Sequence, residues 1–176
     1  CYTFRKFTLF ETIDQVAGIG VKHIEAYPGQ AIGGGVEGKT HFSMPASSRE
    51  AILAKLRAAG VELVAYGVVN CGSTAEWRQL FEFAEAMGIE TITSEPTPEQ
   101  LPALDQRCEE FQISLAIHNH AEPSRYWDPT TVLEACEGRS LRVGACVDNG
   151  HWVRSGLDPV AGLRTLEGRV LGVHLK

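Results

Sequence analysis

Short apolar runs alternate with amphipathic stretches along most of the chain, and this alternation is its strongest pattern. The apolar runs lack strict apolar–polar alternation, which is typical of strands that other elements cover on both faces. The stretches between them have the apolar spacing of helices. Strands that alternate with helices indicate a parallel sheet. The predicted strands lie near residues 2, 24, 64, 91, 115, 144 and 172.

The helices predicted between these strands have recognisable ends. Ser47 or Ser48 is expected to cap a helix over residues 49–59, and Gly60 is expected to end it. The other predicted helices cover residues 9–17, a segment from Ser73 or Thr74 to 87, a segment with Pro98 at its first position, residues 129–137, and a segment capped by Asp158 and Pro159 that stops near 168.

This repeating unit predicts an α/β protein of one domain, residues 1–176, with the (β/α)₈ TIM barrel fold. Such a barrel has eight strands, so the chain is expected to lack the last βα unit and, since it starts at Cys1, some residues before it. A doubly wound open sheet is the alternative. It needs a glycine-rich phosphate loop after the first strand, and residues 4–7 read Phe-Arg-Lys-Phe. Residues 30–45 are rich in glycine and without a clear period, so a long loop over the pocket is expected there.

Polar side chains follow the predicted strands where each strand ends. In a parallel barrel, catalytic groups lie at this carboxyl end of the strands. Four of the six histidines cluster after the strands near 115, 144 and 172, with carboxylates after those near 91 and 144. A set of His, Asp and Glu without thiolates suits Mn²⁺, Mg²⁺, Co²⁺ or Zn²⁺. The strand-end residues are Arg5, Glu25, Tyr27, Asn70, Glu95, His118, Asn119, His120, Asp148, Asn149, His151, His174 and Lys176.

Three segments carry a resemblance to a known family. Residues 147–152 read Val-Asp-Asn-Gly-His-Trp, residues 173–176 read Val-His-Leu-Lys after Gly168, and residues 117–120 read Ile-His-Asn-His. Together they resemble strand-end segments of the xylose isomerase-like sugar isomerase/epimerase superfamily, over essentially the whole chain. The resemblance implies that Asp148 and His174 are metal ligands. It also implies that His151 reaches hydroxyl or carbonyl oxygens of the substrate.

The chain departs from the family pattern at two ligand positions. The family's epimerases place one ligand carboxylate after the fifth strand and another on the eighth. His120 or the nearby Glu122 stands at the first of these positions, Glu95 is a second candidate, and the eighth strand is not in the chain. The expected metal ligands are therefore Asp148, His174, His120 and Glu95, with Mn²⁺ as the first choice of cation.

Other strand-end residues have a functional and a structural interpretation. His118 and His120 are two apart and so point the same way from a strand, where one could fix the tautomer of the other. Glu25 is expected to contact either the substrate or Arg5. Lys176 is expected to neutralise charge on a substrate oxygen. Trp127 and Trp152 would either form an apolar wall against a sugar or simply pack. The substrate-binding candidates are His118, Asn119, His151, Lys176, Glu25 and Trp152.

The resemblance implies a metal-dependent isomerase or epimerase of a sugar or keto-sugar. A metal-stabilised enediolate would form when Glu95, with His151 nearby, takes a proton from the carbon next to the carbonyl. A lyase or dehydratase acting on keto-sugars or inososes is the alternative within the family. A non-catalytic carbohydrate-binding barrel and a metal-dependent endonuclease are alternatives on the same fold.

Composition excludes some classes of function. The net charge is −6 and Lys and Arg are scattered, which disfavours nucleic-acid binding and hence the endonuclease. No apolar stretch reaches the ~18 residues of a membrane span, and no signal peptide is visible. A cytoplasmic enzyme with a small-molecule substrate is therefore expected, and a homo-oligomer is compatible with the sequence. The five cysteines are widely spaced and are expected to be small buried side chains rather than disulfides.

Overall fold

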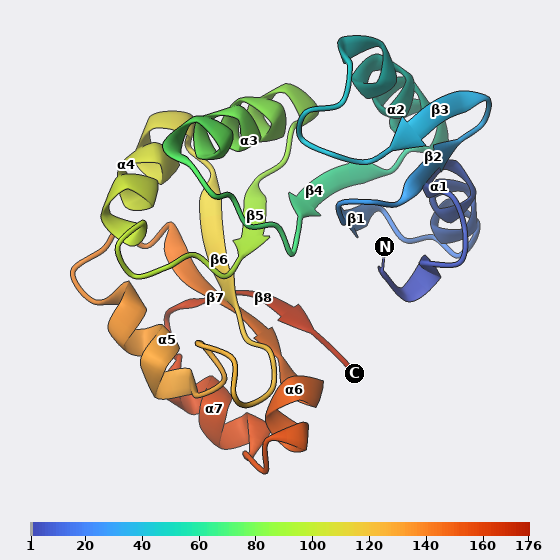
Figure 1. Ribbon diagram of the computed structural model, residues 1–176. Coiled ribbons are helices and arrows are strands. Elements are labelled where there is room, and N and C mark those ends of the chain that lie inside the picture. The colour runs from blue at the N-terminus through green and yellow to red at the C-terminus, as the bar shows by residue number, and fades with distance from the viewer. Residues whose placement is uncertain (1) are drawn as a thin grey trace.

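A curved sheet of six parallel strands forms the centre of the molecule (Figure 1). The computed structural model describes residues 2–176. The strands pair in chain order, each parallel to the next, and every connection between them carries at least one helix. The strands are β1 (His23–Ala26), β4 (Glu62–Tyr66), β5 (Thr91–Ser94), β6 (Ser114–His118), β7 (Val143–Asp148) and β8 (Val170–His174).

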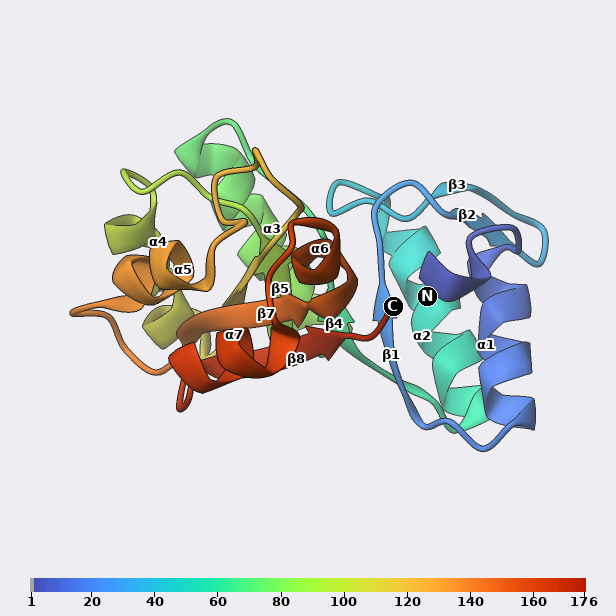
Figure 2. The same ribbon diagram turned by 90° about the horizontal axis from the view of Figure 1, so that it is seen from below.

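The helices lie mainly along the outer side of the curved sheet, so the architecture is that of part of a TIM barrel (Figures 1 and 2). This confirms the predicted α/β fold class. Within the described residues β1 and β8 each pair with only one strand, so the sheet is an open arc. The helices are α1 (Leu9–Gly18), α2 (Ala46–Ala59), α3 (Thr74–Met87), α4 (Leu101–Phe111), α5 (Pro129–Cys136), α6 (Asn149–Arg154) and α7 (Pro159–Thr165).

The central strands are the most deeply buried part of the chain. All six residues of β7 are buried, and four of the five residues of β6 are buried. Four cysteines, Cys71, Cys108, Cys136 and Cys146, are buried with free thiols, as predicted; Cys1 lies outside the described residues. No helix within residues 2–176 combines the length and apolar character needed to cross a lipid bilayer.

The prediction of a strand near residue 2 is wrong. Tyr2–Phe4 forms a short 3₁₀ helix, η1, and the first strand of the sheet is β1. The Tyr2 side chain is 60% exposed, and the Arg5 guanidinium lies over its ring. A short apolar run does not by itself distinguish a strand from a helical turn.

The segment predicted to be one long loop contains a β-hairpin. Strands β2 (Ala31–Gly33) and β3 (Val36–Lys39) pair antiparallel. The two residues between them, Gly34 and Gly35, have φ angles of 61° and 81°, the left-handed values that a two-residue hairpin turn requires. A side chain at Gly34 would also collide with the ring of Phe10 on α1. The Gly-Gly pair was the available signal for this hairpin.

Several helix ends agree with the sequence and two do not. Ser73 caps α3, Asp158 caps α7, and Gly60 ends α2 in the left-handed conformation. However, α2 begins at Ala46, so Ser47 and Ser48 lie inside it rather than capping it. Helix α4 begins at Leu101 rather than at Pro98, because the Gln100 side chain accepts a hydrogen bond from the Thr97 N–H and closes a turn there.

Candidate metal centre

The predicted site residues converge at the carboxyl ends of four adjacent strands. His118, Asp148 and His174 are the last residues of β6, β7 and β8, and Glu95 follows β5 directly. The rings of His118, His120, His151 and His174 lie close together, with centroids 4.6–5.8 Å from that of His118. Parallel pairing in chain order places these four strand ends side by side.

Asp148 lies at the centre of this group and is completely buried. Its Oδ1 atom accepts a hydrogen bond from the His151 backbone N–H and so caps α6. Its Oδ2 atom accepts no well-aligned hydrogen bond from any of residues 2–176. Four nitrogen atoms surround Oδ2: Lys176 Nζ at 2.5 Å, His118 Nε2 at 3.6 Å, His151 Nε2 at 3.7 Å and His174 Nδ1 at 3.9 Å.

The Asp148 carboxylate is held in its charged form. Burial acts to raise its pKa, but His118, Lys176 and the His151 N–H outweigh that effect and lower the pKa. Asn119 fixes the residue in place, because its amide oxygen accepts from the Asp148 N–H at 2.7 Å and its amide N–H₂ donates to the Asp148 carbonyl at 3.0 Å. Both ends of this buried amide are therefore engaged, and Asn119 orients Asp148 rather than facing a substrate.

His118 connects two carboxylates. Its Nδ1 atom lies 3.2 Å from Oε1 of Glu95, and a carboxylate only accepts, so Nδ1 is the donor. The Nε2 atom of the same ring then points at Oδ2 of Asp148. Burial acts to lower the pKa of His118, but Asp148 and Glu95 outweigh it and raise the pKa. A histidine between a carboxylate and a metal is a common arrangement, since the carboxylate fixes the ring and its tautomer.

His174 has the same arrangement with its two nitrogens exchanged. Its Nε2 atom lies 2.6 Å from Oε2 of Glu25, which leaves Nδ1 facing Asp148. Hydrogen bonds with Cys146 and Glu25 raise the pKa of His174. Glu25 also accepts a hydrogen bond from Thr93 at 2.8 Å, whereas the guanidinium of Arg5, its predicted structural partner, lies over the Tyr2 ring. Burial acts to raise the pKa of Glu25, but His174 and Thr93 outweigh it and lower the pKa.

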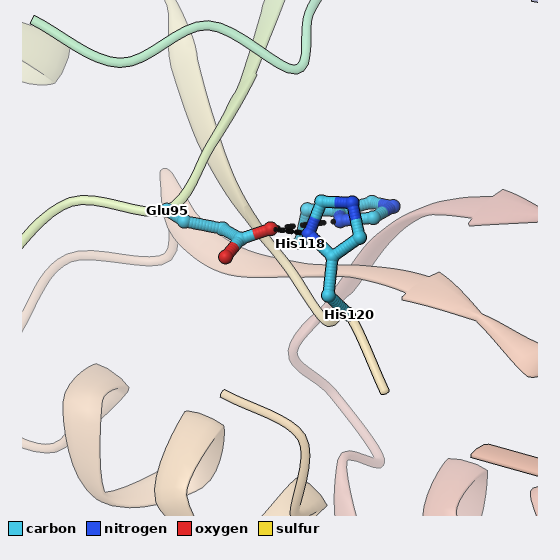
Figure 3. A group of neighbouring side chains, drawn as sticks. All are labelled: Glu95, His118 and His120. Carbon is cyan, nitrogen blue, oxygen red and sulfur yellow. Dashed lines mark hydrogen bonds and ion pairs between the residues drawn. The ribbon is translucent and has the colours of Figure 1, made fainter. Parts of the chain in front are cut away.

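Glu95 contacts two imidazoles through one oxygen (Figure 3). Both His118 Nδ1 and His120 Nδ1 reach Oε1, and neither reaches Oε2. Asn70 supports this segment, since its amide oxygen accepts from the Glu95 N–H at 2.9 Å. Burial acts to raise the pKa of Glu95, but His118 and His120 outweigh it and lower the pKa. His120 is half exposed, so Glu95, His118 and His120 form an outer group beside the buried Asp148.

Comparison with known proteins identifies the fold. No model of a known protein family and no curated protein matches the chain.

Solved structures do match. One is described as a putative uncharacterized protein from Parabacteroides distasonis; it is 31% identical with a TM-score of 0.86, and the match covers 99% of this chain and 71% of that one. A xylose isomerase-like TIM barrel protein from Mycobacterium smegmatis, solved with magnesium, is 14% identical with a TM-score of 0.69, and the match covers 95% and 65%. This chain has the fold of the xylose isomerase-like TIM barrel proteins. A D-tagatose 3-epimerase-like protein has the same fold, at 15% identity, a TM-score of 0.71, and coverage of 96% and 71%.

Within this fold, the four predicted metal ligands divide into two pairs. Nδ1 of His174 lies 3.9 Å from the buried Oδ2 of Asp148, whereas His120 and Glu95 form the outer group with His118. Two sets of ligand atoms are close enough to share a cation: Glu95, His118 and His120 form one, and His118, Asp148 and His151 form the other. His118 belongs to both sets, so it is the residue that connects the outer group to Asp148.

His151 and Lys176 lie on the open side of Asp148. Lys176 Nζ is 3.4 Å from His151 Nε2, and the Lys176 backbone N–H donates to Asn149 at 2.9 Å. Arg154, which no sequence pattern marked as a site residue, contacts Nδ1 of His151 at 3.1 Å. Burial and the charges of Lys176 and Arg154 lower the pKa of His151 to about 4, against the opposing effect of Asp148, so the ring is neutral at pH 7.

Trp152 does not line this site. Its side chain is 1% exposed, and a Cβ added at Gly162 of α7 would lie 2.8 Å from its indole ring. The ring therefore packs α6 against α7 in the core, which is the structural one of its two predicted roles. The prediction that Trp152 contacts substrate is not supported by this burial.

Proposed function

We propose that this chain carries the metal centre of a divalent-metal-dependent enzyme that isomerises or epimerises a sugar or keto-sugar. The observation that carries the proposal is the buried Oδ2 atom of Asp148, which lacks a well-aligned hydrogen bond and is surrounded by nitrogen atoms. The nearest of these nitrogen atoms is the Lys176 ammonium at 2.5 Å, so this buried oxygen already faces a positive charge, and a divalent cation would compete for the same place. The D-tagatose 3-epimerase-like protein with this fold is consistent with this chemistry.

The chemistry of the donor set suits a divalent cation. Asp148 Oδ2, His118 Nε2 and His174 Nδ1 would hold it, with Glu95 and Glu25 orienting the two imidazoles from behind. Three protein ligands of this kind leave positions open for substrate oxygens, as catalytic sites do. Imidazole ligands suit ions such as Zn²⁺ and Co²⁺ and carboxylate ligands suit Mn²⁺ and Mg²⁺, so this mixed set is compatible with each of them, and Mn²⁺ is the cation proposed first.

The residues around the cation position have separate tasks. A bound divalent cation acts as a Lewis acid that polarises the substrate carbonyl and acidifies the adjacent C–H. Glu95 is ionised at neutral pH and keeps Oε2 clear of both histidines, so it is the group proposed to take the proton. Lys176 and His151 lie beside Asp148 and would hold the substrate oxygens on which negative charge develops.

Removal of a proton next to a carbonyl provides the test. The protein is stripped with a chelator, reloaded with Mn²⁺, and incubated in D₂O with a panel of ketoses and keto-sugars. Proton NMR is expected to show loss of the C–H signal next to the carbonyl of one of them, only in the presence of metal. A lyase acting on such a compound would begin with the same exchange. Absence of exchange across the panel, in a protein that binds no cation on titration, would contradict the proposal and favour a non-catalytic barrel.

A further inference from the structure

His151 differs from the other two histidines around Asp148 in the partner behind its ring. His118 and His174 each have a carboxylate there, Glu95 and Glu25. His151 has a guanidinium, because the Arg154 NH2 group lies 3.1 Å from its Nδ1 atom. Arg154 also donates from Nε to the Gly150 carbonyl at 3.2 Å, which holds the guanidinium along α6.

These partners assign opposite tautomers. A carboxylate only accepts hydrogen bonds, so His118 Nδ1 and His174 Nε2 must be donors, and the other nitrogen of each ring could ligate a cation that displaces its proton. Arginine only donates, so His151 Nδ1 must accept. With Nδ1 as acceptor, the one ring proton of His151 resides on Nε2. That atom lies 3.7 Å from the acceptor Asp148 Oδ2 and 3.4 Å from the Lys176 ammonium, which is a donor, so Asp148 is the group that this proton can face.

The consequence concerns what His151 can bind. Metal ligation through Nε2 would require the proton to sit on Nδ1, where it would point at an Arg154 N–H only 3.1 Å away. Two donors would then face each other at 3.1 Å, whereas on the Nε2 side the Lys176 donor is farther away, at 3.4 Å, and Asp148 Oδ2 offers an acceptor at 3.7 Å. Although Nε2 of His151 lies close to Asp148, the Arg154 contact disfavours its use as a ligand.

We infer that Arg154 is a positioning residue that fixes His151 as an Nε2–H donor, so that His151 donates to a substrate oxygen and does not ligate the cation at Asp148. This inference rests on the proposed function for the role of the cation. The tautomer itself can be measured without substrate or turnover.

The test is ¹⁵N NMR of protein with labelled histidine, in the metal-free state and loaded with diamagnetic Zn²⁺ at pH 7.5. The His151 signals are assigned with His151→Gln. In the wild type, Nδ1 is expected to resonate as an unprotonated nitrogen and Nε2 as a protonated one, in both states. In Arg154→Met, the unprotonated Nδ1 signal is expected to be lost or averaged toward the protonated position. Arg154→Lys restores a donor and is expected to recover the unprotonated Nδ1 signal. The control, Arg164→Met on the exposed face of α7, removes the same charge and is expected to leave the His151 signals unchanged.

A protonated Nδ1 in the wild type, or zinc ligation by His151 Nε2, would overturn the inference even if no variant folds. An Arg154→Met protein with an unchanged His151 spectrum would also overturn it. Failure of the proposed function would give a different result. Zinc would then leave the ¹⁵N chemical shifts of His118 Nε2 and His174 Nδ1 unchanged, while the ¹⁵N chemical shifts of His151 would still report its tautomer.

Discussion

Nε2 of His174 lies 2.6 Å from Oε2 of Glu25, and this contact joins the last strand of the sheet to the first. The two residues are 149 positions apart in the chain. Because Nε2–H of His174 donates to Glu25, the ring turns Nδ1 towards Asp148, where loss of the Nδ1 proton would leave a lone pair for a cation. A carboxylate on one edge strand therefore orients the proposed metal ligand on the other.

Glu25→Ala is expected to weaken metal binding without removing a ligand. The His174 ring loses its acceptor and is free to rotate or change tautomer, and loss of such a partner typically costs 10–100-fold in metal affinity. Calorimetric titration with Mn²⁺ measures the change. Glu62→Ala is the matched control, since Glu62 is an exposed carboxylate on the neighbouring strand β4 that pairs with His23. Equal affinity in Glu25→Ala and wild type would show that His174 is not a ligand oriented by Glu25.

Asp148→Asn is expected to abolish metal binding while it preserves the fold. Asparagine is as good a helix cap as aspartate, so the hydrogen bond to the His151 N–H and the start of α6 should survive. The neutral amide lacks the charge that a divalent cation needs. His174→Ala is expected to lose the metal as well, because it removes a proposed ligand. Metal content by mass spectrometry and thermal unfolding are measured together, and full metal occupancy in both variants would show that the ligand assignment is wrong.

The sequence predicts the fold and the convergence of the site because both follow from local patterns. The apolar runs locate β1 and β4 to β8, and parallel order then brings their polar ends together. What it missed depends on single contacts. The strand expected near residue 2 has no local signal that separates it from a 3₁₀ turn, whereas the hairpin at Gly34 and Gly35 had one in the Gly-Gly pair.

The separate roles of the site residues cannot be predicted from their spacing in the sequence. Asn119 is adjacent to two histidines in the sequence, yet its partner is the backbone of Asp148 on the next strand. Arg154 follows His151 by three positions on a helix that the sequence did not predict, so no pattern marked their contact. The role of each side chain depends on its hydrogen-bond partner. That partner is known only from the structure, in which the strand ends lie side by side.

Two substitutions at Glu95 separate its two proposed tasks. Glu95→Gln keeps an oxygen that accepts from His118 Nδ1–H but removes the base, so metal affinity should stay within a few-fold of wild type. Deuterium exchange into the substrate should fall about 10²–10⁴-fold, the usual contribution of a general base. Glu95→Ala also removes the acceptor and should reduce metal affinity about 10–100-fold. Exchange at the wild-type rate in Glu95→Gln would assign the proton transfer to another residue.

Lys176→Met is expected to strengthen metal binding and weaken catalysis. The Lys176 ammonium lies 2.5 Å from Asp148 Oδ2, where it competes with a cation for the same oxygen. Its place is well defined, since its backbone N–H donates to Asn149, and a Cβ added at Gly150 would lie 2.7 Å from the Lys176 Cβ. Methionine keeps the apolar part of the side chain and removes the charge, so the dissociation constant for Mn²⁺ should decrease. Deuterium exchange should also slow, because the positive charge that would stabilise the substrate oxygen is lost.

Lys55→Met is the control. Lys55 pairs with Asp14 at 2.5 Å on the outer helices, so its substitution should leave both the metal affinity and the exchange rate unchanged. Weaker metal binding in Lys176→Met would mean that the ammonium supports the cation rather than competing with it.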